Sequence, residues 1–208
     1  MYRYALCILF ALPMFLFAQN DQQIIIYLNG GSSVGKTTFA RHLQERFDQP
    51  LLYVGIDWVI AMMPEKVNDF KADKEGELPG FYWERTADGA LKTMRFGPFA
   101  QEMLELYRQM VNSLAAQGYS LVIDDISIGK EEVDKWRRTL QGYPVIYVGL
   151  TAPSSIIDQR ERERGDRLIG VASKLALLVH EGVEYDLMLD TYQQSADENT
   201  EKIKKIIK

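Results

Sequence analysis

The sequence predicts an α/β fold in which a five-stranded, mostly parallel β-sheet carries helices on both faces. Two observations lead to this prediction. Five short apolar runs rich in β-branched residues alternate along the chain with segments of helical periodicity, and parallel strands require a long, usually helical, crossover between them. In addition, the chain has 208 residues, 47% hydrophobic and 25% charged, which suffices for one domain with a full core and excludes a disordered chain.

The strands are expected at the five apolar runs. These runs are continuous rather than alternating, which is typical of parallel strands buried on both faces. Connections between such strands are right-handed in nearly all known folds. In chain order, the runs occupy residues 24–28, 51–56, 120–123, 145–150 and 187–189. A single domain is therefore expected over residues 24–208.

Helical periodicity marks the segments between the strands. Residues 37–47 place apolar side chains one helical turn apart, and residues 100–117 do so over the longest stretch, which Gly118 should end. The tail, residues 196–208, is an amphipathic closing helix whose apolar side is expected to pack on the sheet, with a partner surface as the alternative. Between residues 65 and 98 the periodicity fails and turn signals appear, so this segment is interpreted as an insert over the site that binds the substrate.

Charge and composition exclude several classes of partner. The chain has 29 acidic and 24 basic residues, a net charge of −5, and no run of lysine and arginine that could neutralise many phosphates, so nucleic acid is not expected as a partner. The single cysteine, Cys7, excludes an internal disulfide. With only His42 and His180 besides, the chain lacks the ligands of a Cys/His zinc site. Both histidines are interpreted as helix residues without a catalytic role, and no feature of the sequence sets the oligomeric state.

Residues 1–18 are apolar except for Arg3 and Pro13. The run is too short to span a bilayer of about 30 Å but has the length of the hydrophobic part of an export signal, with cleavage expected after Ala18. The alternative is a misplaced start, in which synthesis begins at Met14. In either case the segment lies outside the predicted fold, and the remaining protein is expected to form no stable association with a membrane.

A glycine-rich loop between the first predicted strand and the first predicted helix fits G-x-x-x-x-G-K-[ST], the phosphate-binding loop. Glycines allow successive backbone N–H groups to point at phosphate oxygens, with the positive end of the following helix behind them. The lysine would reach the β- and γ-phosphates, and the threonine hydroxyl would bind Mg²⁺. ATP and Mg²⁺ are therefore the expected cofactors. The residues expected to bind them are Gly30, Gly31, Ser32, Ser33, Val34, Gly35, Lys36, Thr37 and Thr38.

Two groups of aspartates match the needs of a small-molecule kinase, which requires a carboxylate base and an acid that orders the metal ion. The base-reading N-K-x-D of GTPases is absent from the chain. Asp57 follows the second strand, where an acceptor would lie beside the loop, and is predicted to be the base; the alternative is that it caps a helix beginning at Trp58. Asp124 and Asp125 follow the third strand and are the candidate metal ligands, of which only one need be functional.

Four arginines lie within eight residues, at Arg160, Arg162, Arg164 and Arg167. A run of this kind with intervening acids is often a solvated helix face held by ion pairs. Gly165 breaks the helix and places Arg164 and Arg167 on a hinge-like segment, as a lid that closes over ATP requires. Residues 160–170 are therefore predicted to form a lid. Arg164 and Arg167 are its candidate catalytic arginines, and Arg160 is assigned to ATP binding.

Four blocks of sequence, in order, resemble the chloramphenicol 3-O-phosphotransferase family. They read NGGSSVGKT, VGIDWVIAMMP, VIDD, and RERERGDRLIG followed by VHEGVEYDLMLDT, and the likeness runs from about residue 24 to residue 191. It implies an ATP-dependent kinase of P-loop, nucleotide-kinase-like fold that phosphorylates a hydroxyl of a small molecule. By this resemblance Asp57 is the catalytic base, and Lys36 and Thr37 are the phosphate and magnesium ligands. Arg164 and Arg167 correspond to the lid arginines.

The sequence does not identify the acceptor molecule or the cellular compartment in which the protein acts. The insert is longer and more aromatic than the resemblance implies, and its Phe81, Tyr82, Trp83 and Phe96 are expected in the acceptor pocket. Such a pocket suits the ring of chloramphenicol but equally a nucleoside, a sugar nucleotide or another metabolite. Two other functions compete: a nucleotide-dependent switch that hydrolyses ATP slowly, and a toxin-like kinase of a sugar nucleotide or dinucleotide. Use of ATP favours action in the cytoplasm, whereas the apolar leader favours export.

Overall fold

A five-stranded parallel sheet forms the centre of the protein. The computed structural model describes residues 22–207 apart from residue 75, residues 86–90 and residues 165–171. The strands are β1 (Ile25–Asn29), β2 (Leu51–Gly55), β5 (Ser120–Asp125), β6 (Val145–Thr151) and β7 (Leu187–Asp190). They lie in the order β2-β5-β1-β6-β7, and every pair is parallel. The predicted α/β fold and its five strands are therefore confirmed.

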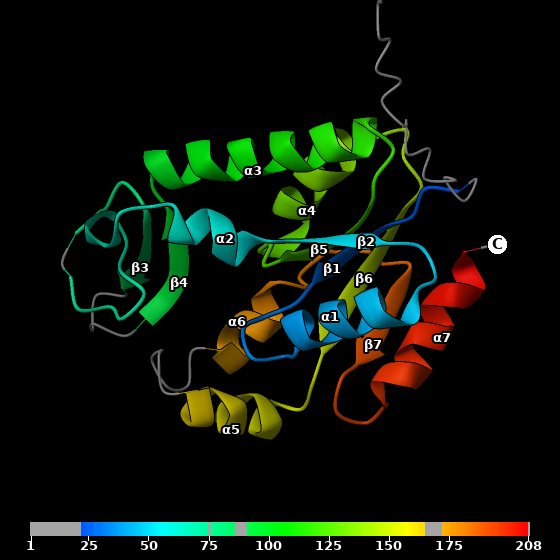
Figure 1. Cartoon of the computed structure of the whole chain (residues 1–208). Helices are drawn as coiled ribbons and strands as arrows, with labels where there is room; N and C mark the ends of the chain where they lie inside the picture. Colours follow the sequence, from blue (N-terminus) through cyan, green and yellow to red (C-terminus); the bar gives the residue numbers. More distant parts are fainter. Residues whose placement is uncertain (1–21, 75, 86–90, 165–171, 208) are drawn as a thin grey trace, which may run out of the picture.

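Helices cover both faces of this sheet (Figure 1). One face packs against α1 (Lys36–Arg46), α5 (Ser154–Arg164), α6 (Ala172–Leu178) and α7 (Ala196–Ile206), and the other against α2 (Ile56–Ala61), α3 (Pro98–Ala116) and α4 (Gly129–Thr139). Strand β1 serves both cores because its side chains alternate: Ile26 and Leu28 point to the first face, and Ile25 and Tyr27 to the second. All four side chains are fully buried, as the continuous apolar run predicts.

Two predicted helices illustrate how local sequence sets the boundaries. Helix α3, the longest helix of the described residues, begins at Pro98, whose missing N–H costs nothing in the first helical turn. Helix α7 begins with a capping box, in which the Ser195 hydroxyl and the Glu198 carboxylate each bond the other's backbone N–H. Ile203 of α7 is fully buried against the sheet core, so the tail packs on the sheet as expected.

The segment between α2 and α3, interpreted from its sequence as an aperiodic insert, contains regular structure. A short 3₁₀ turn, η1 (Glu65–Val67), precedes an antiparallel hairpin of β3 (Phe81–Arg85) and β4 (Leu91–Phe96), which lies apart from the main sheet (Figure 1). Asn68 joins the two parts, because its side-chain oxygen accepts a hydrogen bond from the backbone N–H of Phe81 at 2.9 Å. The hairpin escaped prediction because only part of it is buried, so its apolar residues do not follow a single period.

The apolar leader, residues 1–18, and Arg167 of the predicted lid lie outside the described residues. Within the part of the chain that the structure describes, no helix has both the length and the apolar character needed to cross a bilayer.

Candidate active site

The phosphate loop joins β1 to α1 and depends on two glycines for its path. Gly35 directly precedes α1 and has φ +96°, a backbone conformation that residues other than glycine rarely adopt. A Cβ on Gly31 would lie 2.7 Å from Cα of Ala176 on α6, so only glycine fits between the loop and that helix. The loop therefore ends at the N-terminus of an 11-residue helix. Backbone N–H groups of a first helical turn and the helix dipole attract phosphate oxygens.

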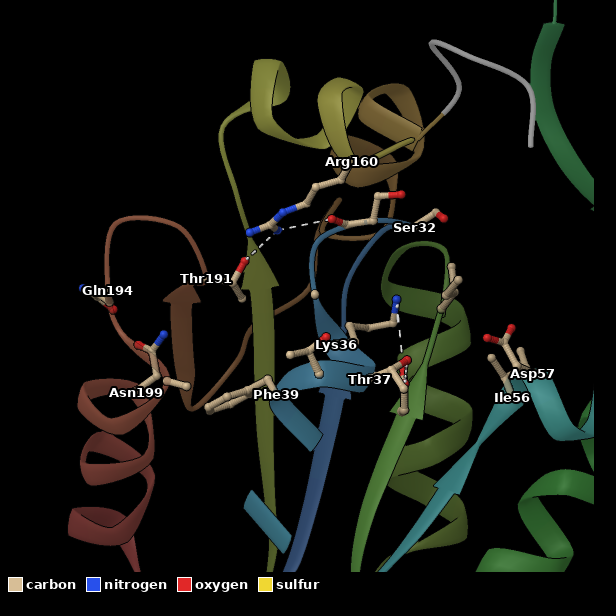
Figure 2. A pocket seen from close by; sticks show the side chains of 16 residues that line it. Ser32, Lys36, Thr37, Phe39, Ile56, Asp57, Arg160, Thr191, Gln194 and Asn199 are labelled. Atoms are coloured by element: carbon tan, nitrogen blue, oxygen red, sulfur yellow. Dashed lines mark hydrogen bonds and ion pairs between the residues drawn. The ribbon is translucent and has the colours of Figure 1, made fainter. Parts of the chain in front are cut away.

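A cavity of about 370 Å³ opens over this loop (Figure 2). Its walls come from loops at the carboxyl ends of β1, β5 and β7 and from α1, α2, α5 and α7. Of the residues predicted to bind nucleotide, Ser32, Ser33, Gly35, Lys36, Thr37, Thr38 and Arg160 line it. Gly30, Gly31 and Val34 are not part of its wall, and they shape the loop from behind.

Lys36, Thr37 and Asp124 meet at the floor of the cavity. The Thr37 hydroxyl donates to Oδ2 of Asp124 at 2.6 Å, and the Tyr53 hydroxyl donates to the same oxygen at 3.0 Å. The Lys36 ammonium lies 4.0 Å from Oδ1 of Asp124 and donates to the Gly31 carbonyl at 2.9 Å. A hydroxyl and a carboxylate side by side suit Mg²⁺, which takes one or two protein oxygens and completes its shell with phosphates and water. The described residues contain no cluster of three or more acidic, histidine or cysteine side chains that could hold a metal ion.

Asp125 does not join this group. Its Oδ2 accepts hydrogen bonds from the Tyr27 hydroxyl at 3.0 Å, the Ser127 hydroxyl at 2.6 Å and the Trp136 indole N–H at 2.7 Å. Burial raises the pKa of the Asp125 carboxyl above its ordinary value. The neighbouring aspartates thus point to opposite sides of β5: Asp124 lies in the phosphate-loop cavity, whereas Asp125 lines a second cavity and ties β1 to α4.

Replacing Asp125 by leucine should destabilise the fold. The change leaves the buried Trp136 N–H without an acceptor and removes a partner from Tyr27 and Ser127, which should lower the free energy of unfolding by about 2–4 kcal/mol. Denaturant unfolding measures this loss. Asp125→Asn, which keeps an acceptor oxygen, should lose clearly less; equal losses in both variants would contradict the role assigned to these hydrogen bonds.

Asp57 lies in the first turn of α2 and lines the phosphate-loop cavity (Figure 2) as well as a second cavity. The alternative reading of Asp57 as a helix cap is wrong, because α2 begins at Ile56 and Gly55 occupies the cap position. The exposed Asp57 side chain lines both the phosphate-loop cavity and its neighbour, a position that it shares with Ser32, Ile56 and Ile126. A molecule in either cavity could therefore contact this carboxylate.

The second cavity, about 260 Å³, is largely apolar. Phe81 and Phe96 of the hairpin line it as expected, whereas Tyr82 and Trp83 do not. The indole N–H of Trp83 donates to the Phe70 carbonyl at 3.3 Å. The remaining apolar wall comes from Ile56, Ile60, Phe70, Met94, Leu104, Tyr107, Ile126, Ile128, Trp136 and Leu175. An apolar, aromatic wall of this kind binds flat or branched apolar groups.

Two charged residues of this cavity, Arg108 and Glu132, were not among the residues predicted from the sequence. Arg108 of α3 is only 7% exposed and donates two hydrogen bonds to Glu105, at 3.0 and 3.1 Å. It lines both the apolar cavity and an adjoining polar groove of about 550 Å³ between β4, α3 and α4. In sequence it belongs to an ordinary amphipathic helix, so no local signal distinguishes it.

The arginines of the predicted lid take different positions along α5. Arg160 extends from α5 to the phosphate loop, where its guanidinium donates to the carbonyls of Ser33 at 3.3 Å and Val34 at 3.2 Å. Arg162 is exposed, and Arg164 is the last residue of α5. The predicted lid beyond it, including Arg167, lies outside the described residues. Arg160 is thus the arginine that the described structure brings to the loop.

His180 lies in the turn after α6, so the prediction that it is a helix residue is wrong. Its ring lies between the Tyr185 hydroxyl at 3.0 Å and the Leu150 carbonyl at 3.1 Å, and burial lowers the pKa of the imidazole. Tyr185 in turn contacts Asn29 at the end of β1, whose amide bonds Ser127 through both its oxygen and its nitrogen. This buried network holds the start of the phosphate loop against β5 and β6.

The carboxyl ends of all five strands contribute to one edge of the sheet, where parallel α/β proteins bind their ligands. A phosphate loop after the first strand, followed by a helix whose N-terminus faces the cavity, is the architecture of the P-loop kinases. The fold and site therefore place this chain in the phosphotransferase class.

Within that class the chain belongs to the chloramphenicol phosphotransferase-like family, whose model matches residues 23–208. It is 31% identical over 173 residues to two proteins from Mycobacterium tuberculosis strains CDC 1551 and H37Rv, which carry the provisional name O-phosphotransferase. These matches cover 80% of this chain and 74% of the relatives. The family predicted from the sequence is confirmed.

Solved structures share the fold at low sequence identity. A sugar kinase from Janibacter sp. HTCC2649 matches with TM-score 0.60 and 18% identity over 89% of this chain and 94% of its own. The Mycobacterium tuberculosis APS kinase CysC in complex with AMPPNP and APS matches with TM-score 0.60 and 14% identity, over 89% and 98%. The Deinococcus radiodurans tunicamycin resistance protein matches with TM-score 0.57 and 18% identity, over 89% and 96%. All three have the P-loop kinase fold in common with this chain.

Proposed function

We propose that the protein transfers the γ-phosphoryl group of ATP to a hydroxyl of a small molecule. The observation that carries this proposal is the position of Asp57 in the wall between the two cavities. One cavity contains the phosphate loop, and the other is apolar, so a triphosphate and an organic acceptor would meet at this carboxylate. A protein that only hydrolyses ATP as a switch has no need for a second, largely apolar cavity beside the phosphates.

The residues divide the chemistry among them. Asp57 would accept the proton of the acceptor hydroxyl while the oxygen of that hydroxyl attacks the γ-phosphorus, in line with the departing ADP. Lys36 and the loop N–H groups would hold the phosphates and spread the negative charge of the transition state. Thr37 and Asp124 would hold Mg²⁺, which supplies charge neutralisation at the phosphates when bound. Arg164 and Arg167 remain candidates for further neutralisation from the lid.

The apolar cavity defines what the acceptor must look like. A cavity of about 260 Å³ lined by aromatic and aliphatic side chains admits a ring or a branched apolar group, with its hydroxyl directed at Asp57. Chloramphenicol meets this description and, as the compound in the family's name, is the first acceptor to assay. Nucleosides and sugar nucleotides are the next class, since the polar groove beside Arg108 offers room for a charged extension.

Incubation of the protein with MgATP and a metabolite extract tests the proposal. Mass spectrometry should detect an acceptor that gains one phosphate, in a molar amount equal to the ADP formed. Chloramphenicol is assayed in parallel as a single defined acceptor. Release of ADP and inorganic phosphate with no phosphorylated product would contradict the proposal and favour the switch.

A further inference from the structure

Tyr53 of β2 reaches from the edge strand of the sheet to the carboxylate of Asp124. Its hydroxyl donates to Oδ2 of Asp124 at 3.0 Å, and the Thr37 hydroxyl donates to the same oxygen at 2.6 Å. Strands β2 and β5 are neighbours in the sheet, and Asp124 pairs in register with Gly55, two residues after Tyr53. The hydrogen bond therefore links the strand that leads to Asp57 with the strand that carries Asp124.

Three neighbours hold the Tyr53 side chain in this position. The guanidinium of Arg41 lies 4.0 Å from the centre of the tyrosine ring, one helical turn after Thr37 on α1. The ring of Trp58 meets it edge-on, with the ring centres 5.2 Å apart. Gly55 makes room, because a Cβ there would collide with the hydroxyl and lie 2.9 Å from Cζ of the ring. With 7% of its surface exposed, Tyr53 is a donor held in one place by its surroundings.

The two donors leave one oxygen of the Asp124 carboxylate for another partner. Both bond Oδ2, whereas Oδ1 accepts no hydrogen bond from the described residues and has the Lys36 ammonium 4.0 Å away. Thr37 gives its hydrogen to Oδ2 and keeps its oxygen lone pairs for a cation. Hydrogen bonds of this kind, from groups that do not touch the metal ion, orient carboxylate ligands in proteins. The arrangement thus prepares Oδ1 of Asp124 and the hydroxyl oxygen of Thr37 for one ion.

We propose that Tyr53 is a positioning residue, which fixes the Asp124 carboxylate so that Oδ1 faces Mg²⁺ or one of its water molecules. A carboxylate held by Thr37 alone can turn about its Cβ–Cγ bond, and a second donor from a neighbouring strand removes this freedom. The inference rests on the proposed function, because it assumes a nucleotide triphosphate with its Mg²⁺ at the phosphate loop.

Calorimetry on the full chain with AMPPNP, an ATP analogue that resists hydrolysis, tests the proposal. The affinity is measured with excess Mg²⁺ and with a chelator in its place, and the ratio of the two affinities is the gain that the metal ion provides. Tyr53→Phe keeps the ring and its contact with Arg41 and removes only the hydroxyl. The gain should fall about tenfold, the low end for losing a partner of a metal ligand, because Thr37 still donates to Asp124. The affinity without Mg²⁺ should change little.

Tyr147→Phe is the matched control. Tyr147 is a buried tyrosine of the same sheet, the guanidinium of Arg137 lies 4.6 Å from the centre of its ring, and it lines neither cavity. This variant should keep the full gain. Gly55→Ala is a second test variant, because its Cβ would displace the Tyr53 hydroxyl without removing it and should also reduce the gain.

The possible results separate this inference from the proposed function. An unchanged gain in Tyr53→Phe would overturn the positioning role. An equal loss of affinity with and without Mg²⁺ would overturn it too, because Tyr53 would then only support the loop. If the unmodified protein binds AMPPNP equally well in both conditions, the metal site at Asp124 and this inference fail, while the phosphate loop remains a nucleotide site. If it binds AMPPNP in neither condition, the proposed function itself fails.

Discussion

Asp57→Asn should retain affinity for ATP and lose about 10²-fold or more of its turnover, the usual cost of removing a general base. The amide occupies the same space between the two cavities but accepts a proton far less readily than a carboxylate. Because Asp57 is exposed and does not cap α2, the substitution should leave the free energy of unfolding nearly unchanged. Steady-state kinetics with a phosphorylated acceptor, together with calorimetric binding of ATP, measure the two effects.

Glu45→Gln is the matched control for Asp57→Asn. Glu45 is an exposed carboxylate on α1 and lines neither cavity, so the same chemical change there should leave turnover unaffected. If Asp57→Asn keeps the turnover of the unmodified protein, Asp57 is not the base. In that case the position between the cavities would serve only to orient the acceptor.

Lys36→Ala should weaken the binding of ATP by about tenfold or more. It should also reduce the rate of phosphoryl transfer, by about tenfold to 10³-fold. Lys36 is 7% exposed, and its ammonium lies between the loop and the Asp124 carboxylate. Its removal takes away a positive charge that acts on the phosphates in both the bound state and the transition state. Kinetics at saturating ATP separate the loss in rate from the loss in binding.

Lys205→Ala provides the control for this prediction, since Lys205 is exposed on α7 and outside the cavity wall. Because Lys36 is buried, unfolding of Lys36→Ala must also be measured. The variant should fold, since its backbone loop depends on Gly31 and Gly35. A folded Lys36→Ala protein with unchanged binding and rate would exclude the phosphate loop as the site of transfer.

The sheet was predictable because each strand carries its own signal. A continuous apolar run is expected wherever helices cover both faces, and β1 and β5 display this without interruption before their polar ends. The phosphate loop was equally predictable, because the path of its backbone requires glycine at positions 31 and 35. In both cases the physical requirement falls on a few adjacent residues, so the amino-acid sequence records it directly.

The different roles of the two neighbouring aspartates on β5 were not predictable from the sequence. Asp124 and Asp125 are identical residues at adjacent positions, yet one faces Thr37 and the other accepts the indole N–H of Trp136. The alternation of a strand separates them, but which face holds the cavity depends on where α1 and α4 pack. The position of Arg108 in the wall of the apolar cavity depends in the same way on how the helices pack.

The parallel α/β fold, the phosphate loop and the family follow from local periodicity and from contiguous motifs, so the order of the amino acids suffices to predict them. The lining of the apolar cavity, and the choice of Asp124 rather than Asp125 to face the phosphate loop, depend instead on how the helices pack on the sheet. Such properties are distances between residues far apart in the chain, such as the 2.6 Å between Thr37 and Asp124. They arise when the helices pack on the sheet, and no local pattern encodes them.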